Sequence, residues 1–154
     1  MSELEQPDPV AAGSVLRIPA TVNHLATVRS FIRHEAQRAG ADPRAVADIV
    51  QAVDESVTNA ILHGYRGSDG TVEVEVDRFG SSLIVRLRDQ APPFDPTLLP
   101  APDITSSLDK RPLGGLGVFL TRELMDAVTY QHTKEGNELT LVKECISPPG
   151  GGKC

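Results

Sequence analysis

The feature that most constrains this chain is the segment Asp54–Gly64, which reads Asp-Glu-Ser-Val-Thr-Asn-Ala-Ile-Leu-His-Gly. In a helix, Glu55, Asn59 and His63 lie on one stripe, because residues four apart stack on the same face. The opposite face is aliphatic and is predicted to lie on the core; it carries Val46, Ile49, Val50, Val53, Val57, Ala60 and Ile61. Such a helix packs one face on another layer and leaves a carboxylate, a carboxamide and an imidazole uncovered.

This uncovered stripe has two interpretations. It can be no more than the wet side of an amphipathic helix, as polar residues at helical spacing usually are. Two details favour a binding surface instead. Asn is a poor residue for a helix interior, because its amide competes for backbone groups, and the apolar Leu62 lies on the same stripe. A stripe of mixed polarity suits a nucleotide.

Composition excludes several classes of protein. The 154 residues, 40% of them hydrophobic and 23% charged, suit one globular domain. A net charge of -6 argues against direct binding of nucleic acid, which needs a basic face. The two cysteines, Cys145 and Cys154, form no zinc motif and are expected to be free thiols. With neither an apolar leader nor a membrane-spanning stretch, we expect a cytoplasmic protein without membrane contact.

Periodicity predicts the order of the elements. Strands are expected over 14–18, 71–77, 83–88, 128–132 and 139–142, and helices over 25–39, 42–63 and 114–125. The pair Asp42-Pro43 is typical of a helix start, and Gly64 is expected to end that helix in a left-handed conformation. The proline-rich segment 90–112 is long for a loop in a compact domain, which favours a functional role.

This order is not the alternation of a doubly wound parallel fold. It predicts an α+β fold, a two-layer sandwich in which helices cover one face of a mixed, mostly antiparallel sheet. The folded domain is expected over 14–146, with a disordered lead over 1–13 and a flexible tail over 147–154.

A second motif follows the strand over 83–88 and reads Arg88-Asp-Gln-Ala-Pro-Pro-Phe-Asp-Pro96. A carboxylate at a strand end can accept a hydrogen bond from the exocyclic amine of adenine, whereas guanine offers a carbonyl there. A charge-assisted contact of this kind contributes about 1.5–3 kcal/mol. The alternative is that Asp89 only initiates a turn before the prolines.

A third motif opens the helix predicted over 114–125. Gly114, Gly115 and Gly117 would let backbone N–H groups approach phosphate oxygens at a helix N-terminus, and Lys110 and Arg111 would add positive charge. The segment is neither a Walker A sequence nor a dinucleotide fingerprint. Taken alone, it can equally be a flexible hinge.

In this order, the three motifs resemble the nucleotide site of the GHKL superfamily, which includes Hsp90-type and gyrase-type ATPases and histidine-kinase catalytic domains. More closely, the chain is similar to the small bacterial anti-sigma-factor serine kinases. The first motif matches their first box from Asp54 through Tyr65, and Asp89 with Pro93-Phe94-Asp95-Pro96 matches the second. Gly114–Gly117, followed by Leu124-Met125-Asp126, matches the third. The resemblance covers about residues 14 to 145.

The resemblance implies a site for ATP and Mg²⁺. Asn59 would bind the metal through its amide oxygen, and Glu55 would be the general base for an attacking serine hydroxyl. Asp89 would read adenine, with Thr140 beside it. The remaining implied nucleotide-binding positions are His63, Ala91, Phe94, Arg111 near the γ-phosphate, Leu116, and the phosphate-contacting Gly114, Gly115 and Gly117. The segment 90–112 would be a long ATP lid.

One position departs from the family. The second residue after the adenine-binding aspartate is usually Gly, because the backbone passes close to the base there, and here it is Ala91. The added methyl group either is tolerated or weakens nucleotide binding.

The resemblance implies a serine protein kinase that phosphorylates a STAS-domain anti-anti-sigma protein and sequesters a sigma factor, and that forms a homodimer. One alternative is a regulatory adapter that sequesters a protein partner and binds nucleotide weakly or without turnover; Ala91 favours it, and Glu55 and Asn59 count against it. An ATPase or histidine-kinase domain is a further alternative. The chain lacks room for a transducer domain, and His34-Glu35 lies on a single short helix, so we expect His34 to face solvent.

Overall fold

The computed structural model of the protein describes residues 13–93, 121–144 and 146. One sheet contains the five described strands β1 (Ser14–Pro19), β2 (Thr71–Phe79), β3 (Ser82–Asp89), β4 (Ala127–Thr133) and β5 (Gly136–Lys143), in the order β1-β2-β3-β5-β4. All four pairings between these strands are antiparallel.

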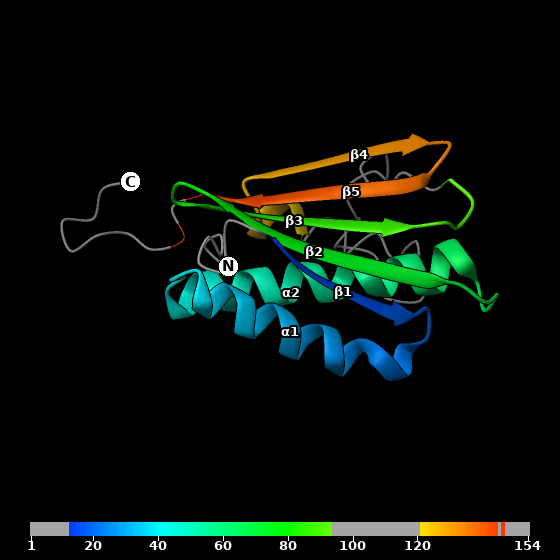
Figure 1. The fold of residues 1–154 in the computed structure, drawn as a ribbon, viewed down its shortest axis with the longest axis horizontal. Coiled ribbons are helices and arrows are strands. Elements are labelled where there is room, and N and C mark those ends of the chain that lie inside the picture. Colours follow the sequence, from blue (N-terminus) through cyan, green and yellow to red (C-terminus); the bar gives the residue numbers. More distant parts are fainter. Residues whose placement is uncertain (1–12, 94–120, 145, 147–154) are drawn as a thin grey trace, which may run out of the picture.

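The described helices form a second layer on one face of the sheet (Figure 1). They include the short turn η1 (Val22–His24), α1 (Leu25–Arg38), α2 (Pro43–Asn59) and the π-helical turn η2 (Ala60–Tyr65), which continues α2. The prediction of a two-layer α+β sandwich with helices on one face is confirmed. None of the described helices is both long and apolar enough to span a membrane.

The core lies between the two layers. The buried residues of the two central strands alternate along each strand, as the predicted pattern requires: Val72, Val74 and Val76 on β2, and Leu83, Val85 and Leu87 on β3. They meet the aliphatic face of α2, where Val46, Ile49, Val53, Val57 and Ile61 are buried and Val50 is partly buried. Each fully buried aliphatic side chain contributes about 1.5–3 kcal/mol, so this contact fixes α2 on the sheet.

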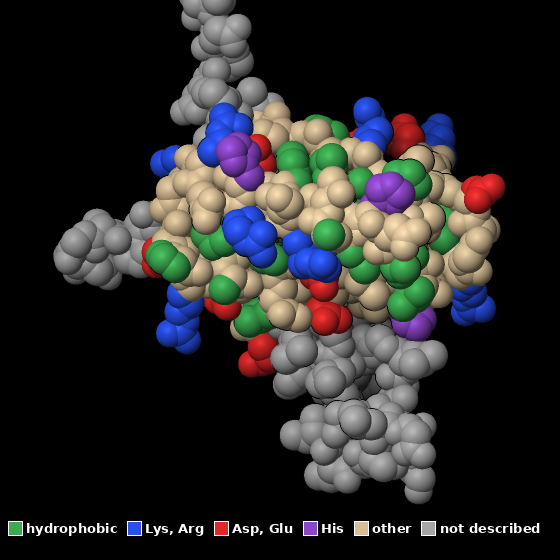
Figure 2. All heavy atoms as spheres, turned by 90° about the horizontal axis from the view of Figure 1, so that it is seen from below, with side chains coloured by type: hydrophobic (Ala, Val, Ile, Leu, Met, Phe, Trp, Pro, Cys, Tyr) green, Lys and Arg blue, Asp and Glu red, His purple; other side chains and the backbone are tan. Residues whose placement is uncertain are grey.

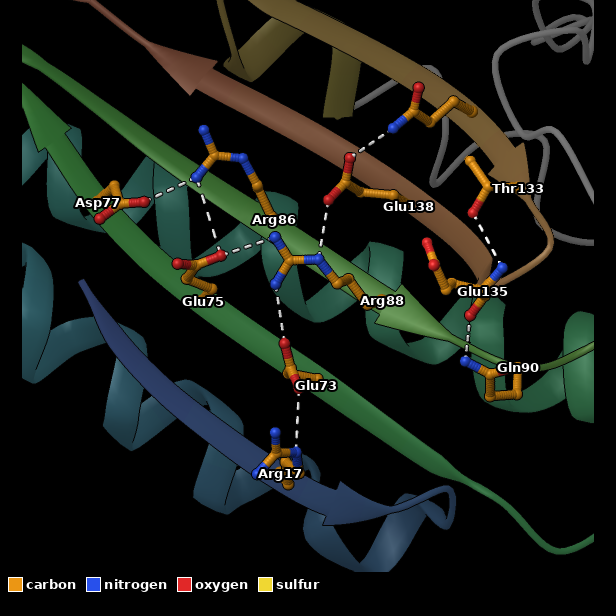
Figure 3. A network of polar contacts seen from close by, with 11 residues as sticks. Arg17, Glu73, Glu75, Asp77, Arg86, Arg88, Gln90, Thr133, Glu135 and Glu138 are labelled. Carbon is orange, nitrogen blue, oxygen red and sulfur yellow. Dashed lines mark hydrogen bonds and ion pairs between the residues drawn. The ribbon is translucent and has the colours of Figure 1, made fainter.

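The opposite face of the sheet has no described helix over it and is charged. We name it the open face; its described charged residues are Arg17, Glu73, Glu75, Asp77, Arg86, Arg88 and Glu138, which form the ladder of ion pairs in Figure 3. Figure 2 looks from below onto the side of the molecule where α1 and β1 lie in Figure 1, and there basic, acidic and His side chains lie among apolar ones.

The beginning of α2 is as predicted, but its end is not. Asp42 Oδ1 accepts a hydrogen bond of 2.8 Å from the backbone N–H of Ala45, and Pro43 follows as the first helical residue. At the other end, helical structure continues through Tyr65, and the left-handed residue is Arg66, with φ of 53°. The prediction that Gly64 is the left-handed cap is therefore wrong. Tyr65 is buried, and its hydroxyl donates a hydrogen bond to the carbonyl oxygen of Thr71 at the start of β2, so the last turn extends past Gly64.

Several expectations fall mainly outside the described residues. The lid predicted over 90–112 is described only over 90–93, and the helix predicted over 114–125 only over 121–125, of which 121–124 are helical. The lead over 1–13, the tail over 147–154 and both cysteines also lie almost entirely outside the description. His34 is exposed, as expected.

Candidate functional site

A pocket lies between the C-terminal part of α2 and the neighbouring ends of β3 and β5. Its walls include the apolar residues Ala60, Leu87, Pro92 and Leu139. Its polar groups include Asn59 from the first sequence motif and Asp89 from the second. The structure thus brings these two predicted site residues together in one pocket, although they belong to different layers of the fold.

Asn59 is a buried polar residue without an internal partner. Its exposed fraction is 8%, and among the described residues its carboxamide makes no hydrogen bond. Buried polar side chains are nearly always hydrogen-bonded, and an unsatisfied one costs about 1–3 kcal/mol. A buried amide without a hydrogen bond at the wall of a pocket is suited to binding a ligand. Its oxygen atom is also a type of ligand that Mg²⁺ prefers.

Glu55 lies one helical turn before Asn59 and is partly buried. Gln51 Nε2 donates a hydrogen bond of 3.2 Å to Glu55 Oε2. Burial, followed by the negative charge of Asp54, raises the pKa of Glu55 above its ordinary value, and the hydrogen bond from Gln51 only partly opposes this effect. A carboxylate with a raised pKa is a stronger proton acceptor, which is the property a general base needs.

Asp89 is held at the end of β3 by a defined set of donors. Its Oδ1 atom accepts hydrogen bonds from the backbone N–H of Ala91 at 2.9 Å and from Asn137 Nδ2 at 2.8 Å. Asn137 lies opposite Asp89 in the pairing of β3 with β5 and is itself buried. Within the described residues Asp89 Oδ2 has no hydrogen-bond partner, so it is available to a donor in the pocket.

The same register corrects the prediction for Thr140. Asp89 pairs with Asn137, whereas Thr140 pairs with Arg86. Because alternate residues of a strand point to opposite faces, Thr140 lies on the open face with Glu138, and Asn137 lies on the helix side with Leu139. The prediction that Thr140 lies beside Asp89 is therefore wrong, and Asn137 occupies that place.

Ala91 is buried and is not among the residues that line the pocket. Its methyl group faces Gly64: a Cβ built on Gly64 would lie 3.2 Å from the Ala91 Cβ. The methyl group that departs from the family pattern is thus accommodated by a glycine on η2.

Tyr65 links three segments around the site. Its hydroxyl donates a hydrogen bond of 2.7 Å to the carbonyl oxygen of Thr71 and accepts one of 2.8 Å from the backbone N–H of Gln90. It therefore joins the end of η2 to the start of β2 and to the residue that follows Asp89. The sequence motif contained Tyr65, but nothing in the sequence alone assigned it this contact.

The other predicted nucleotide-binding positions are not among the described residues that line the pocket. His63 lies in η2, half-buried, and does not line the pocket. Phe94, Arg111, Gly114, Gly115, Leu116 and Gly117 lie outside the described residues. In the part of the chain that is described, no group of three or more His, Cys, Asp or Glu side chains is placed to hold a metal. A Mg²⁺ ion that arrives with a nucleotide does not need such a cluster, because phosphates and water supply most of its ligands.

Comparison with known proteins identifies the family. The family model described as "Histidine kinase-like ATPase domain" matches residues 18–143. The chain is 31% identical over 133 residues to the serine-protein kinase RsbW of Listeria monocytogenes serovar 1/2a, covering 83% of this chain and 84% of that protein. It is 30% identical over 135 residues to the serine-protein kinase RsbW of Staphylococcus epidermidis, with the same coverage.

Solved structures share the fold. The RsbU and RsbW domains of Rv1364c from Mycobacterium tuberculosis match with a TM-score of 0.63 at 24% identity, over 86% of this chain and 31% of that one. The catalytic domain of the histidine kinase ThkA matches with a TM-score of 0.50 at 14% identity, over 86% of this chain and 97% of that one. This chain therefore belongs to the histidine kinase-like ATPase domain family and, within it, to the anti-sigma-factor serine kinases.

Proposed function

We propose that this protein is an ATP-dependent serine protein kinase. The observation that carries the proposal is the pocket in which the unpartnered amide of Asn59 and the anchored carboxylate of Asp89 lie together, on facing layers of the fold. These groups suit the two ends of Mg²⁺-ATP. The amide oxygen of Asn59 suits the metal ion, and the carboxylate of Asp89 is a fixed hydrogen-bond acceptor for adenine. The relatives named serine-protein kinases support the reaction class.

Each residue has a role in this proposal. Asp89 Oδ2 accepts a hydrogen bond from the exocyclic amine of adenine, and Asn59 holds Mg²⁺. The metal ion, when bound, neutralises the charge of the phosphates. His63, Ala91, Phe94, Arg111 and the run Gly114, Gly115, Leu116 and Gly117 are proposed as the further nucleotide contacts on the strength of the family resemblance alone.

Glu55 is the proposed general base. It takes the proton of a serine hydroxyl as the new bond between the serine oxygen and the γ-phosphorus forms. The bond between that phosphorus and the bridging oxygen breaks, and ADP leaves with its electron pair. The raised pKa of Glu55 favours this proton transfer at neutral pH.

The partners are part of the proposal. The protein substrate is a STAS-domain anti-anti-sigma protein, and the kinase sequesters a sigma factor, as a homodimer in the cytoplasm. A phosphoserine carries about -1.5 to -2 charges and can break an interface that buries it. Phosphorylation of the STAS-domain protein would thus release the kinase to bind the sigma factor.

Ala91 is the residue that favours the adapter alternative. Its methyl group packs toward Gly64 and is not among the groups that line the pocket, which supports the kinase. The partly buried carboxylate of Glu55, one helical turn before the pocket residue Asn59, supports the kinase as well.

A phosphotransfer assay tests the proposal. The protein is incubated with radiolabelled ATP, Mg²⁺ and purified STAS-domain proteins, each with a variant that has its acceptor serine replaced by Ala. We expect label on the serine-containing protein alone, and loss of at least about a hundredfold in rate for Glu55→Gln. Glu75→Gln on the open face is the matched control and should keep the wild-type rate. Nucleotide binding without any phosphotransfer would favour the adapter.

A further inference from the structure

We propose that Asn137 is a positioning residue that sets the nucleobase selectivity of this site. It does so by holding Asp89 so that one carboxylate oxygen is left free for the exocyclic amine of adenine. This inference rests on the proposed function, because it takes a nucleotide as the ligand of the pocket.

Asn137 is locked by four hydrogen bonds. Its Nδ2 atom donates to Asp89 Oδ1 at 2.8 Å and to the carbonyl oxygen of Ala91 at 2.9 Å. Its Oδ1 atom accepts from the hydroxyl of Tyr130 and lies 3.0 Å from His132 Nδ1. With an exposed fraction of 7%, the side chain has no room to turn toward solvent.

The orientation of this amide follows from its neighbours. A backbone carbonyl only accepts hydrogen bonds, so the Asn137 atom that faces the Ala91 carbonyl must be the amide nitrogen. The amide oxygen then faces the Tyr130 hydroxyl, which can donate to it. Asn137 therefore presents a donor, and not an acceptor, to Asp89.

This arrangement divides the two oxygens of Asp89 between different tasks. Oδ1 accepts both internal hydrogen bonds, from Asn137 Nδ2 and from the backbone N–H of Ala91. Oδ2 has no partner among the described residues and remains for the pocket. A carboxylate oxygen held in this way accepts from the adenine amine and offers no donor to the guanine carbonyl, so its orientation determines which base binds.

Asn137→Asp is the informative variant, because it keeps the shape of the side chain and removes its donor. The variant loses the donor to Asp89 Oδ1 and places a second carboxyl group against it, so Asp89 is no longer held with Oδ2 free for the pocket. We expect ATP affinity to fall by about tenfold or more. The ratio of ATP to GTP affinity should fall as well, because guanine has no amine at the position that Asp89 recognises in adenine.

The hairpin of β4 and β5 offers a matched control. Gln131 Nε2 donates a hydrogen bond of 2.9 Å to Glu138 Oε1 across the same two strands, but on the open face. Gln131→Glu therefore makes the same change, an amide to a carboxylate opposite a carboxylate, away from the pocket. It should keep the wild-type ratio of ATP to GTP affinity.

The test is calorimetric titration of the full chain with Mg²⁺-ATP and Mg²⁺-GTP. It compares wild type, Asn137→Asp, Gln131→Glu and Asn137→Ala, which removes the donor without adding charge and serves if Asn137→Asp does not fold. A lowered ratio of ATP to GTP affinity in the folded Asn137 variants, and not in Gln131→Glu, supports the inference.

The contrary outcomes are distinct. If wild type prefers ATP and folded Asn137 variants keep that preference, the inference fails and the proposed function stands. If folded Asn137 variants lose both nucleotides equally, Asn137 has a general structural role, which also overturns the inference. If folded wild type binds neither nucleotide, the proposed function fails, and the inference fails with it.

Discussion

Gly64 on η2 lies against Ala91, two residues after the end of β3: a Cβ built on Gly64 would lie 3.2 Å from the Ala91 Cβ. The first and second sequence motifs thus touch at this point, beside the pocket that contains Asn59 and Asp89. Contacts this short require a neighbour to move by a few tenths of an ångström. The two positions are therefore coupled, and only one of them can carry a methyl group without a shift.

Gly64→Ala tests this coupling. Overpacking at a well-packed contact costs about 1–3 kcal/mol, so we expect a lower free energy of unfolding and weaker ATP binding. Adding Ala91→Gly to the same chain should restore both, because it removes the opposing methyl group. Denaturant unfolding and calorimetry of the two single variants and the double variant measure the coupling. Strictly additive effects would show that the two side chains do not compete for space.

Asn59→Ala should separate stability from function. The variant removes a buried amide that has no partner among the described residues and replaces it with a better helix former. We expect the free energy of unfolding of the nucleotide-free protein to rise by about 1 kcal/mol, as measured by denaturant unfolding. Thr58→Ala on the same turn is a control, because the Thr58 hydroxyl already donates to the carbonyl oxygen of Asp54. A clear loss of stability in Asn59→Ala would mean that the amide has an internal partner.

Glu55 should set the acid limb of the pH–rate profile. A general base works only when it is ionised, so kcat/KM should fall as the pH is lowered through the pKa of Glu55. Because burial and Asp54 raise that pKa, the fall should occur at higher pH than for an ordinary glutamate. Gln51→Ala removes the hydrogen bond that opposes the shift, so it should move the limb to still higher pH. A limb that does not move in Gln51→Ala would count against Glu55 as the titrating group.

Regular periodicity made most of the fold predictable from sequence. The aliphatic stripe of α2 and the alternation along β2 and β3 each leave only one face that can be buried, so helix and strand faces followed directly. The N-cap at Asp42 was predictable because the side chain and the following proline act locally. The meeting of Asn59 with Asp89 depends on long-range packing, and only the family resemblance suggested it.

The errors came from turn geometry and register. The sequence predicts the last strand only from residue 139, but β5 begins at Gly136, so Asn137 is a strand residue opposite Asp89. A strand reverses its side-chain direction at every residue, and Thr140, three positions along, consequently lies on the other face. The π turn at Ala60–Tyr65 was likewise missed, because the Tyr65 hydroxyl that anchors it binds atoms distant in sequence.

Tyr65→Phe should loosen the segment that carries Asp89. The hydroxyl satisfies both the Thr71 carbonyl and the Gln90 N–H, so its removal should lower the free energy of unfolding by about 1–2 kcal/mol. Hydrogen exchange should become faster at the amide of Gln90 and remain unchanged at the amides of β1. Wild-type exchange at Gln90 in the variant would contradict this anchoring role.

Arg88 is the centre of the open face, where it contacts Glu73, Glu75 and Glu138, each at 2.8 Å (Figure 3). Burial acts to lower the pKa of Arg88, but hydrogen bonds to these three carboxylates outweigh it and raise the pKa. Arg88→Met leaves three carboxylates facing one another, so we expect a loss of about 1 kcal/mol in unfolding free energy, which added salt reduces. ATP affinity should stay unchanged, because the open face lies across the sheet from Asn59. Unchanged stability at low salt would show that the ladder contributes nothing measurable.

Asn59 and Asp89 lie in one pocket, where Mg²⁺-ATP is proposed to bind. Calorimetric titration of ATP, with and without Mg²⁺, into wild type and Asn59→Ala tests it. We predict that Mg²⁺ strengthens ATP binding to wild type, and that Asn59→Ala loses this strengthening while remaining folded. Absence of ATP binding by folded wild type would contradict the proposed nucleotide pocket, and an undiminished effect of Mg²⁺ in Asn59→Ala would contradict Asn59 as the residue that holds the metal.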